Sequence, residues 1–222
     1  ALDLEPRKAS IWGDLGSTYL KLGNAEAARQ AYERCLELDP KAASVSQALL
    51  LVHQYLGDLS HQEQADLHQT WANSFLPAHP EPEWGNVPDA ERRLRIGFLS
   101  PDFREHSVSK FLEPVLQSLD HSRVEVFVYS VSTLPLDQVS ARMRSFSDCW
   151  RDVAWQGTAE LVATIRADRV DILVELAGHS EGARLDVIAS RAAPIQTFWM
   201  GYPGTTGLDA FHARFTDAIV DP

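Results

Sequence analysis

Short apolar runs alternate with helical patterns from residue 93 onward, and this alternation restricts the possible folds more than any other feature. The expected strands are 94–99, 124–131, 149–155, 170–176 and 195–200, and the expected helices are 109–119, 136–146, 159–168 and 183–191. Such alternation is typical of βαβ units and predicts a Rossmann-like parallel sheet, covered by helices on both faces. Its crossovers are expected to be right-handed.

A different pattern, of helices alone, occupies residues 1–76. The hexapeptides ALDLEP and CLELDP match with an offset of 34 residues. The frame that they define contains Trp12, Leu15, Gly16, Tyr19, Gly23, Ala28, Tyr32 and Pro40. These are the spacings of the tetratricopeptide repeat, a pair of helices that approach closely at the small residues Gly16 and Ala28. A degenerate copy around Leu56-Gly57-Asp58 is expected to cap the array, because terminal repeats are atypical.

The two patterns are separated by a stretch that has neither period. Residues 76–91 contain four prolines, so we expect a linker there. The predicted organisation is tetratricopeptide repeats with capping helices over 1–76, a linker over 77–92 and a Rossmann-like lobe over 93–222. The first residues include no Met, no basic segment and no apolar segment, so the sequence is expected to begin inside a longer chain.

Charge and composition argue against several kinds of partner. The chain has 31 acidic and 20 basic residues and a net charge of −11, which disfavours nucleic acid because phosphate contacts need clustered Lys and Arg. The one basic cluster, Arg92-Arg93-Arg95, is interpreted as a solvated lead-in to a strand. No apolar run approaches the roughly 18 residues of a membrane span. Two cysteines in separate segments, Cys35 and Cys149, indicate reduced thiols and a cytoplasmic location.

Candidate site residues follow three of the expected strands, because ligands of open parallel sheets bind beyond the carboxyl ends of the strands. The loops 100–107 and 177–184 each place a histidine there, His106 and His179. His106 can accept a proton near neutral pH, or it can cap the next helix, a role that Ser107 or Ser109 could also fill.

Two other residues of the first loop carry open alternatives. Asp102 can orient an imidazole or hydrogen-bond its own backbone, as Asp often does in turns. Phe103 is expected to fill the core beneath the loop. Asp171 and Glu175 lie four residues apart on one strand and are given no catalytic role, because that spacing separates them.

The third loop, 201–207, has three glycines, two threonines and a proline. Exposed amides and hydroxyls in such a loop can cradle a phosphate or a sugar. The loop is not a P-loop, because no lysine follows its last glycine, and no G-x-G-x-x-G follows the first strand, which argues against a nicotinamide cofactor. No cluster of potential ligands has metal-binding spacing, so no metal site is predicted.

Four motifs, in order, complete the picture: LRIGFLSPDFREHSVSKFLEP, DILVELAGHSEGAR, APIQTFWMGYPGTTG and TDAIVDP. Together with the repeats and the linker they closely resemble the O-linked N-acetylglucosamine transferase family, including its bacterial members and the plant SPINDLY protein O-fucosyltransferases. The resemblance covers nearly the whole chain. It implies a GT-B fold, in which two Rossmann-like lobes face a cleft and this chain supplies the amino-terminal one.

The resemblance also implies an activity. Enzymes of that family transfer a sugar from a nucleotide sugar to Ser or Thr of proteins, with inversion and without a metal or other cofactor. We expect UDP-GlcNAc as the donor, with fucose transfer as an open option, and protein or peptide acceptors held by the repeats. A non-catalytic tetratricopeptide scaffold with a decayed glycosyltransferase lobe remains the alternative.

Residue by residue, the resemblance assigns His106 as the catalytic proton acceptor. It assigns to substrate binding Asp102, His179, Gly201, Tyr202, Pro203, Gly204 and Thr205. The pair His212-Ala213 departs from the Asp-Tyr usual in the family, which puts the geometry there in doubt. The sequence ends at Pro222, before the second lobe that supplies most nucleotide contacts in the family, so the 222-residue chain alone is expected to be inactive.

Overall fold

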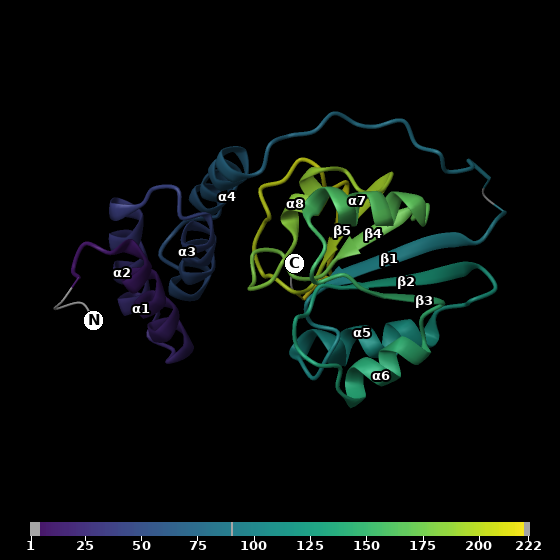
Figure 1. The fold of residues 1–222 in the computed structure, drawn as a ribbon, viewed down its shortest axis with the longest axis horizontal. Helices are drawn as coiled ribbons and strands as arrows, with labels where there is room; N and C mark the ends of the chain where they lie inside the picture. Colours follow the sequence, from purple (N-terminus) through teal and green to yellow (C-terminus); the bar gives the residue numbers. More distant parts are fainter. Residues whose placement is uncertain (1–4, 90, 220–222) are drawn as a thin grey trace. The chain divides into compact units, whose positions relative to one another are not determined.

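The computed structural model describes residues 5–89 and 91–219. The chain divides into two compact units (Figure 1). We call one the helical unit: it contains the described residues up to Phe75 together with the segment Pro203–Gly207. The sheet unit contains the described residues of Leu76–Tyr202 and those that follow Gly207. None of the helices in the described ranges is long and apolar enough to cross a membrane.

The helical unit contains four helices, α1 (Ala9–Lys21), α2 (Ala25–Leu38), α3 (Ala43–Leu56) and α4 (His61–Phe75). Asn24 caps α2, its side chain accepting a hydrogen bond from the Ala27 N–H. The predicted close approach of α1 and α2 is confirmed, because a Cβ at Gly16 would lie 2.4 Å from the Tyr32 ring and Ala28 is fully buried.

The sheet unit has six strands: β1 (Leu94–Ser100), β2 (Val124–Ser130), β3 (Cys149–Asp152), β4 (Ile172–Glu175), β5 (Ile195–Trp199) and β6 (Ala213–Phe215). All pair in parallel in the order β3-β2-β1-β4-β5-β6. The predicted parallel sheet is therefore confirmed. The short strand β6 was not among the expected strands, and its three residues are exposed.

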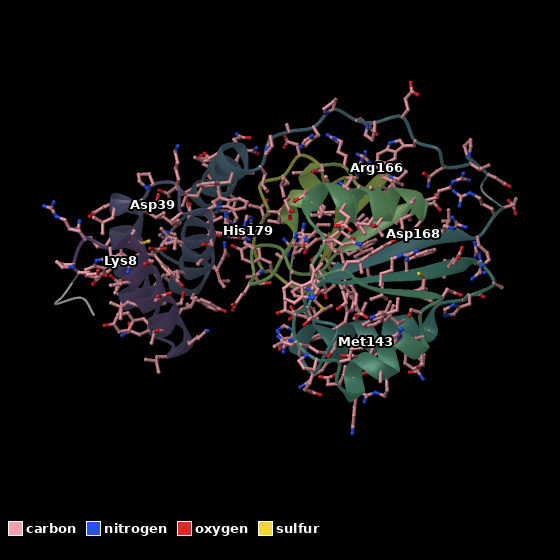
Figure 2. The ribbon with its side chains drawn as sticks, in the orientation of Figure 1. Lys8, Asp39, Met143, Arg166, Asp168 and His179 are labelled. Carbon is pink, nitrogen blue, oxygen red and sulfur yellow. The ribbon has the colours of Figure 1, made fainter. Side chains whose placement is uncertain are left out.

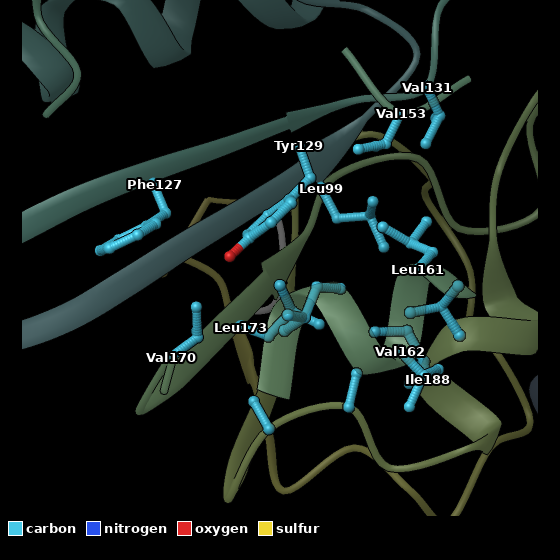
Figure 3. Close-up of a cluster of buried hydrophobic side chains, with 14 of the residues drawn as sticks. Leu99, Phe127, Tyr129, Val131, Val153, Leu161, Val162, Val170, Leu173 and Ile188 are labelled. Atoms are coloured by element: carbon cyan, nitrogen blue, oxygen red, sulfur yellow. The ribbon is translucent and has the colours of Figure 1, made fainter. Parts of the chain in front are cut away.

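Four helices cover the sheet, α5 (Ser107–Ser118), α6 (Gln138–Ser145), α7 (Thr158–Ala167) and α8 (Leu185–Ala189). Figure 1 shows α5 and α6 on one face and α7 and α8 on the other. Successive strand residues alternate between the faces. Phe98 belongs to the core on the α5–α6 side, and Leu99 to the core that contains Leu161 and Ile188 of α7 and α8 (Figure 3).

The strand order places a topological switch at the centre of the sheet. From β1 the chain continues to β2 and β3 on one side, and it then crosses back to β4, β5 and β6 on the other. In open parallel sheets the crevice for ligands lies at such a switch, beyond the carboxyl ends of the two strands. The loops that follow β1 and β4 are therefore neighbours at the position where a ligand is expected.

Candidate functional site

The loop after β1 is held by its own short-range bonds and by a buried aromatic ring. The Asp102 N–H donates to Ser100 Oγ at 3.0 Å, and Ser100 itself is buried. Phe103 is only 2% exposed and meets the ring of Trp150 edge-on, with 5.6 Å between the ring centroids. The expectation that Phe103 fills the core beneath the loop is confirmed, and the loop is thereby anchored at its centre.

His106 caps the helix that follows this loop. Its Nδ1 accepts a hydrogen bond from the Val108 N–H at 3.3 Å. Ser109 completes the cap, because its Oγ donates to the His106 carbonyl at 2.7 Å and accepts from the His106 N–H at 3.4 Å. Of the three capping candidates in the sequence, His106 thus takes the N-cap position. The imidazole is still 36% exposed, so its cap role leaves it accessible to a substrate.

Asp102 lies beside this imidazole. One carboxylate oxygen is 3.7 Å from His106 Nδ1, and the other accepts a hydrogen bond from Arg104 at 3.2 Å. Burial raises the pKa of the Asp102 carboxyl, while the nearby His106 and Arg104 act in the opposite direction. The carboxylate is therefore placed where it can orient the ring and stabilise a proton on Nδ1.

The Val108 N–H fixes one tautomer of the neutral ring. A backbone N–H can only donate, so Nδ1 accepts and the ring proton is on Nε2. Nε2 can take up a proton only when the neutral ring carries its proton on Nδ1, and that proton needs an acceptor in place of the Val108 N–H. Asp102, with one carboxylate oxygen 3.7 Å from Nδ1, is the candidate for that acceptor. Nδ1 thus cannot carry a proton and accept the Val108 hydrogen bond at the same time.

Glu175 ends β4 and organises the loop that follows it. Its carboxyl group is fully buried, and its two oxygens accept the Ala177 N–H at 2.9 Å and the Gly178 N–H at 2.7 Å. Burial, with a smaller contribution from the charge of Asp102, raises the pKa of Glu175 to about 8, although the two backbone N–H groups act in the opposite direction. The loops touch directly, because a Cβ at Gly182 would lie 3.1 Å from Pro101. Two acidic groups therefore interact across the switch point.

His179 and the exit of β5 form the next part of this edge. His179 is 2% exposed, and its ring meets that of Tyr202 edge-on with 5.3 Å between centroids. Gly178 has a φ of +58°, and a Cβ there would lie 2.4 Å from the Cβ of Tyr202. At Gly201 a Cβ would lie 1.5 Å from the Leu176 carbonyl oxygen. The exits of β4 and β5 are thus packed backbone to backbone.

Comparison with known proteins assigns the chain to a family. The model of glycosyl transferase family 41 matches residues 77–222, and a tetratricopeptide repeat model matches residues 9–42. The chain belongs to glycosyl transferase family 41.

Curated relatives of this family 41 chain are longer than it. A probable UDP-N-acetylglucosamine–peptide N-acetylglucosaminyltransferase SPINDLY of Oryza sativa subsp. japonica is 38% identical over 201 residues, covering 87% of this chain and 21% of the relative. Its namesake in Arabidopsis thaliana is 36% identical over 191 residues, covering 84% and 21%. The chain thus spans about a fifth of the length of these relatives.

A solved structure gives the same result for the fold. A mutant O-GlcNAc transferase from Thermobaculum terrenum matches with a TM-score of 0.91 and 34% identity, over 96% of this chain and 41% of that one. The predicted fold class, tetratricopeptide helices followed by the amino-terminal lobe of a glycosyltransferase of this kind, is therefore confirmed.

The structure brings some predicted family 41 site residues together and separates others. Asp102 and His106 are adjacent after β1, and His179 packs on Tyr202. The picture of an open cradle over 201–207 is wrong in part, because Tyr202 and Thr206 are buried.

The residues of that loop from Pro203 onward belong to the helical unit. Pro203, Gly204 and Thr205 are among them, and Thr205 Oγ1 accepts the Gly207 N–H at 3.2 Å. Their assignment to substrate binding stays a prediction. The described part of the chain contains no group of three or more His, Cys, Asp or Glu side chains able to hold a metal ion.

The departure at His212-Ala213 has a structural explanation. The His212 N–H donates to the Gln196 carbonyl at 2.8 Å, and the Gln196 N–H donates to His212 Nδ1 at 3.1 Å. This pair begins the contact between β5 and β6. The backbone at the departure is therefore in an ordered strand pairing.

Glu175 is the group that sequence reasoning missed. The signal was present, since it is an acid in the otherwise apolar run ILVEL, and acids are seldom fully buried without a partner. What the run could not show is that its partners are the two backbone N–H groups that come next in the chain.

Replacing Glu175 with glutamine should flatten the pH dependence of stability. With its pKa raised from 4.5 to about 8, the carboxyl holds its proton in the folded state and loses it in the unfolded state between these values. Stability therefore falls as pH rises through this window, by at most about 1.4 kcal/mol per unit. Glutamine cannot ionise. Its NH₂ also cannot accept the Gly178 N–H, which costs about 1–3 kcal/mol at the acid end.

Urea denaturation between pH 6 and pH 8 checks this. The advantage of wild type over Glu175→Gln should be largest at pH 6 and shrink toward pH 8. Glu160→Gln, at an exposed position on α7, serves as the control and should keep the wild-type profile. A wild-type advantage that is constant with pH would contradict the prediction.

Proposed function

We propose that the protein to which this chain belongs is a protein O-glycosyltransferase. It transfers N-acetylglucosamine from UDP-GlcNAc to Ser or Thr hydroxyls, with inversion and without a metal. The observation that carries the proposal is the family 41 match over 77–222, combined with the Asp102–His106 pair at the carboxyl edge of β1. The names of the relatives from Oryza sativa and Thermobaculum terrenum supply the donor and the acceptor class.

The chemistry assigned to this lobe is a single displacement. The acceptor oxygen attacks the anomeric carbon and forms the new glycosidic bond, while the bond from that carbon to the diphosphate oxygen breaks and the nucleoside diphosphate leaves. In the tautomer whose ring proton is on Nδ1, His106 takes the hydroxyl proton on Nε2. The Nδ1 proton then faces Asp102, which stabilises the imidazolium. Charge on the departing diphosphate is balanced by donors of the second lobe of a GT-B fold.

The helical unit supplies the other half of the proposal. Tetratricopeptide arrays present extended surfaces to proteins, so the repeats are assigned to acceptor binding. The two cysteines are free thiols, which favours a reducing compartment, so we assign the reaction to the cytoplasm.

Transfer assays with the full-length protein test this directly. Acceptor proteins are incubated with UDP-GlcNAc or GDP-fucose, with and without EDTA, and analysed by mass spectrometry. We expect addition of N-acetylglucosamine that EDTA does not reduce. Addition of fucose alone would show that the donor is GDP-fucose and not UDP-GlcNAc, while the assignment as a protein O-glycosyltransferase would stand. Acceptor binding without transfer of either sugar would contradict the enzymatic function and support a non-catalytic scaffold.

A further inference from the structure

A cavity lies at the opposite end of the sheet from the candidate site. It has a volume of about 310 Å³, and it is bordered by the linker residue Asn86, by Glu125 and by the arginines Arg92, Arg93, Arg95 and Arg169. These residues lead into β1 and β2 or precede β4, so they stand at the amino ends of the strands. Figure 2 shows Asp168, the neighbour of Arg169, and His179 near opposite ends of the sheet.

Arg92 closes the cavity on the linker side. Its guanidinium binds both carboxylate oxygens of Asp171, at 2.6 and 2.7 Å, and the Val87 carbonyl at 2.9 Å. Asn86 adds a hydrogen bond to Asp171 at 2.6 Å. The basic cluster interpreted from the sequence as a solvated lead-in is therefore an ordered wall.

The guanidinium groups of Arg93 and Arg95 are held by hydrogen bonds, but not all of their N–H groups are used. Arg93 donates through Nε and Nη2 to the Val124 carbonyl, and Arg95 through Nε to Glu125 and through Nη1 to the Asp168 carbonyl. Within the described ranges, Arg93 Nη1 and Arg95 Nη2 have no hydrogen-bond partner. Each guanidinium has five N–H donors in a rigid fork. Both forks are thus held in position with donors left for a ligand.

Arg169 is the fourth cation and has no ion pair with any residue that the structure describes. Its φ of +52° is left-handed, a conformation that costs a side-chain-bearing residue roughly 1–2 kcal/mol. Glycine or asparagine usually occupies such a position after a helix. The Arg169 carbonyl is fixed by Asn86 at 3.1 Å. Arg169 therefore borders the cavity as a cation without an ion pair among the described residues, on a backbone conformation that is itself costly.

The charge balance of the cavity is positive in a chain of net charge −11. Four arginines and one acid, Glu125, border the cavity. Three of these arginines form ion pairs, with Asp171, Asp148 and Glu125, so one positive charge is left over. Guanidinium forks match tetrahedral oxyanions that accept several hydrogen bonds at once. The volume suits a small molecule.

We propose that this cavity binds a small phosphate-bearing anion, a mono- or diphosphate, separately from the catalytic edge. Because Asn86 and Val87 form part of its border, the bound anion would also tie the linker to the amino ends of the strands.

Titration of the chain with inorganic pyrophosphate tests the proposal, by calorimetry and by NMR of backbone amides. We expect shifts centred on residues 92–95 and 169, and Arg169→Gln should weaken binding at least tenfold. Arg144→Gln, which removes the same charge from an exposed position on α6 that does not border the cavity, is the control and should change affinity less than twofold.

Three results would overturn it. They are absence of binding at millimolar pyrophosphate, equal weakening by both variants, and shifts centred on residues 102–108. Sulfate titrated in parallel should bind more weakly than pyrophosphate, and equal affinity would overturn the assignment to phosphate. None of these readouts depends on sugar transfer.

Discussion

Replacing Gly201 with alanine should destabilise the sheet unit by more than about 4 kcal/mol. Only a few mechanisms produce effects of this size, and overpacking of a buried site is one of them. The new Cβ would lie 1.5 Å from the Leu176 oxygen, 2.6 Å from its carbonyl carbon and 3.1 Å from Ala177 Cα. All three are backbone atoms, so no side-chain rotation relieves the overlap. The exits of β4 and β5 would have to separate, and the packing of Tyr202 on His179 would be lost with them.

Hydrogen exchange of the β4 and β5 amides measures this loss in the sheet unit alone. Gly85→Ala is the matched control, because nothing lies within 4 Å of a Cβ there. It should change the exchange free energies by no more than about 0.5 kcal/mol. If Gly201→Ala behaved like Gly85→Ala, the backbone contact described at this edge would be wrong.

The parallel sheet was predictable because its strands are buried on both faces and flanked by helices of clear period. Its edge was not. Strand β6, Ala213–Phe215, is three exposed residues, and its position depends on the exchange of hydrogen bonds between His212 and Gln196. Pairing of this kind leaves no apolar run in the sequence, so pattern reading cannot find it.

The rim of the candidate site was also predictable, since all parallel strands end at one edge. Which loops meet was not, because alternation of strands and helices does not fix strand order. Only the order β2-β1-β4 brings Pro101 against Gly182 and lets Asp102 act on Glu175. Spacing likewise could not choose among three helix caps, because that choice depends on which side chain reaches the Val108 N–H.

The second large effect concerns His106 in the full-length protein. Asparagine is a good N-cap and should keep the bond from the Val108 N–H, but it cannot take up a proton. His106→Asn should therefore lower kcat/KM by about 10²–10⁴-fold with little change in stability. His106→Ala should lose the same activity and, in addition, about 0.5–2 kcal/mol from the missing cap.

His121 provides the matched control. It is an exposed histidine that pairs with Asp148 at 3.0 Å, and it precedes β2 at the amino end of the sheet. His121→Asn removes the same imidazole away from the catalytic edge, and it should keep kcat/KM within about twofold of wild type.

The decisive measurement is the rate of sugar transfer from UDP-GlcNAc to an acceptor protein by wild type, His106→Asn and His121→Asn in the full-length protein. The account predicts a loss of at least about 100-fold for His106→Asn alone, with both variants folded. Wild-type kcat/KM in His106→Asn would contradict it. The proton would then go to water or to the donor phosphate, and His106 would serve only to begin α5.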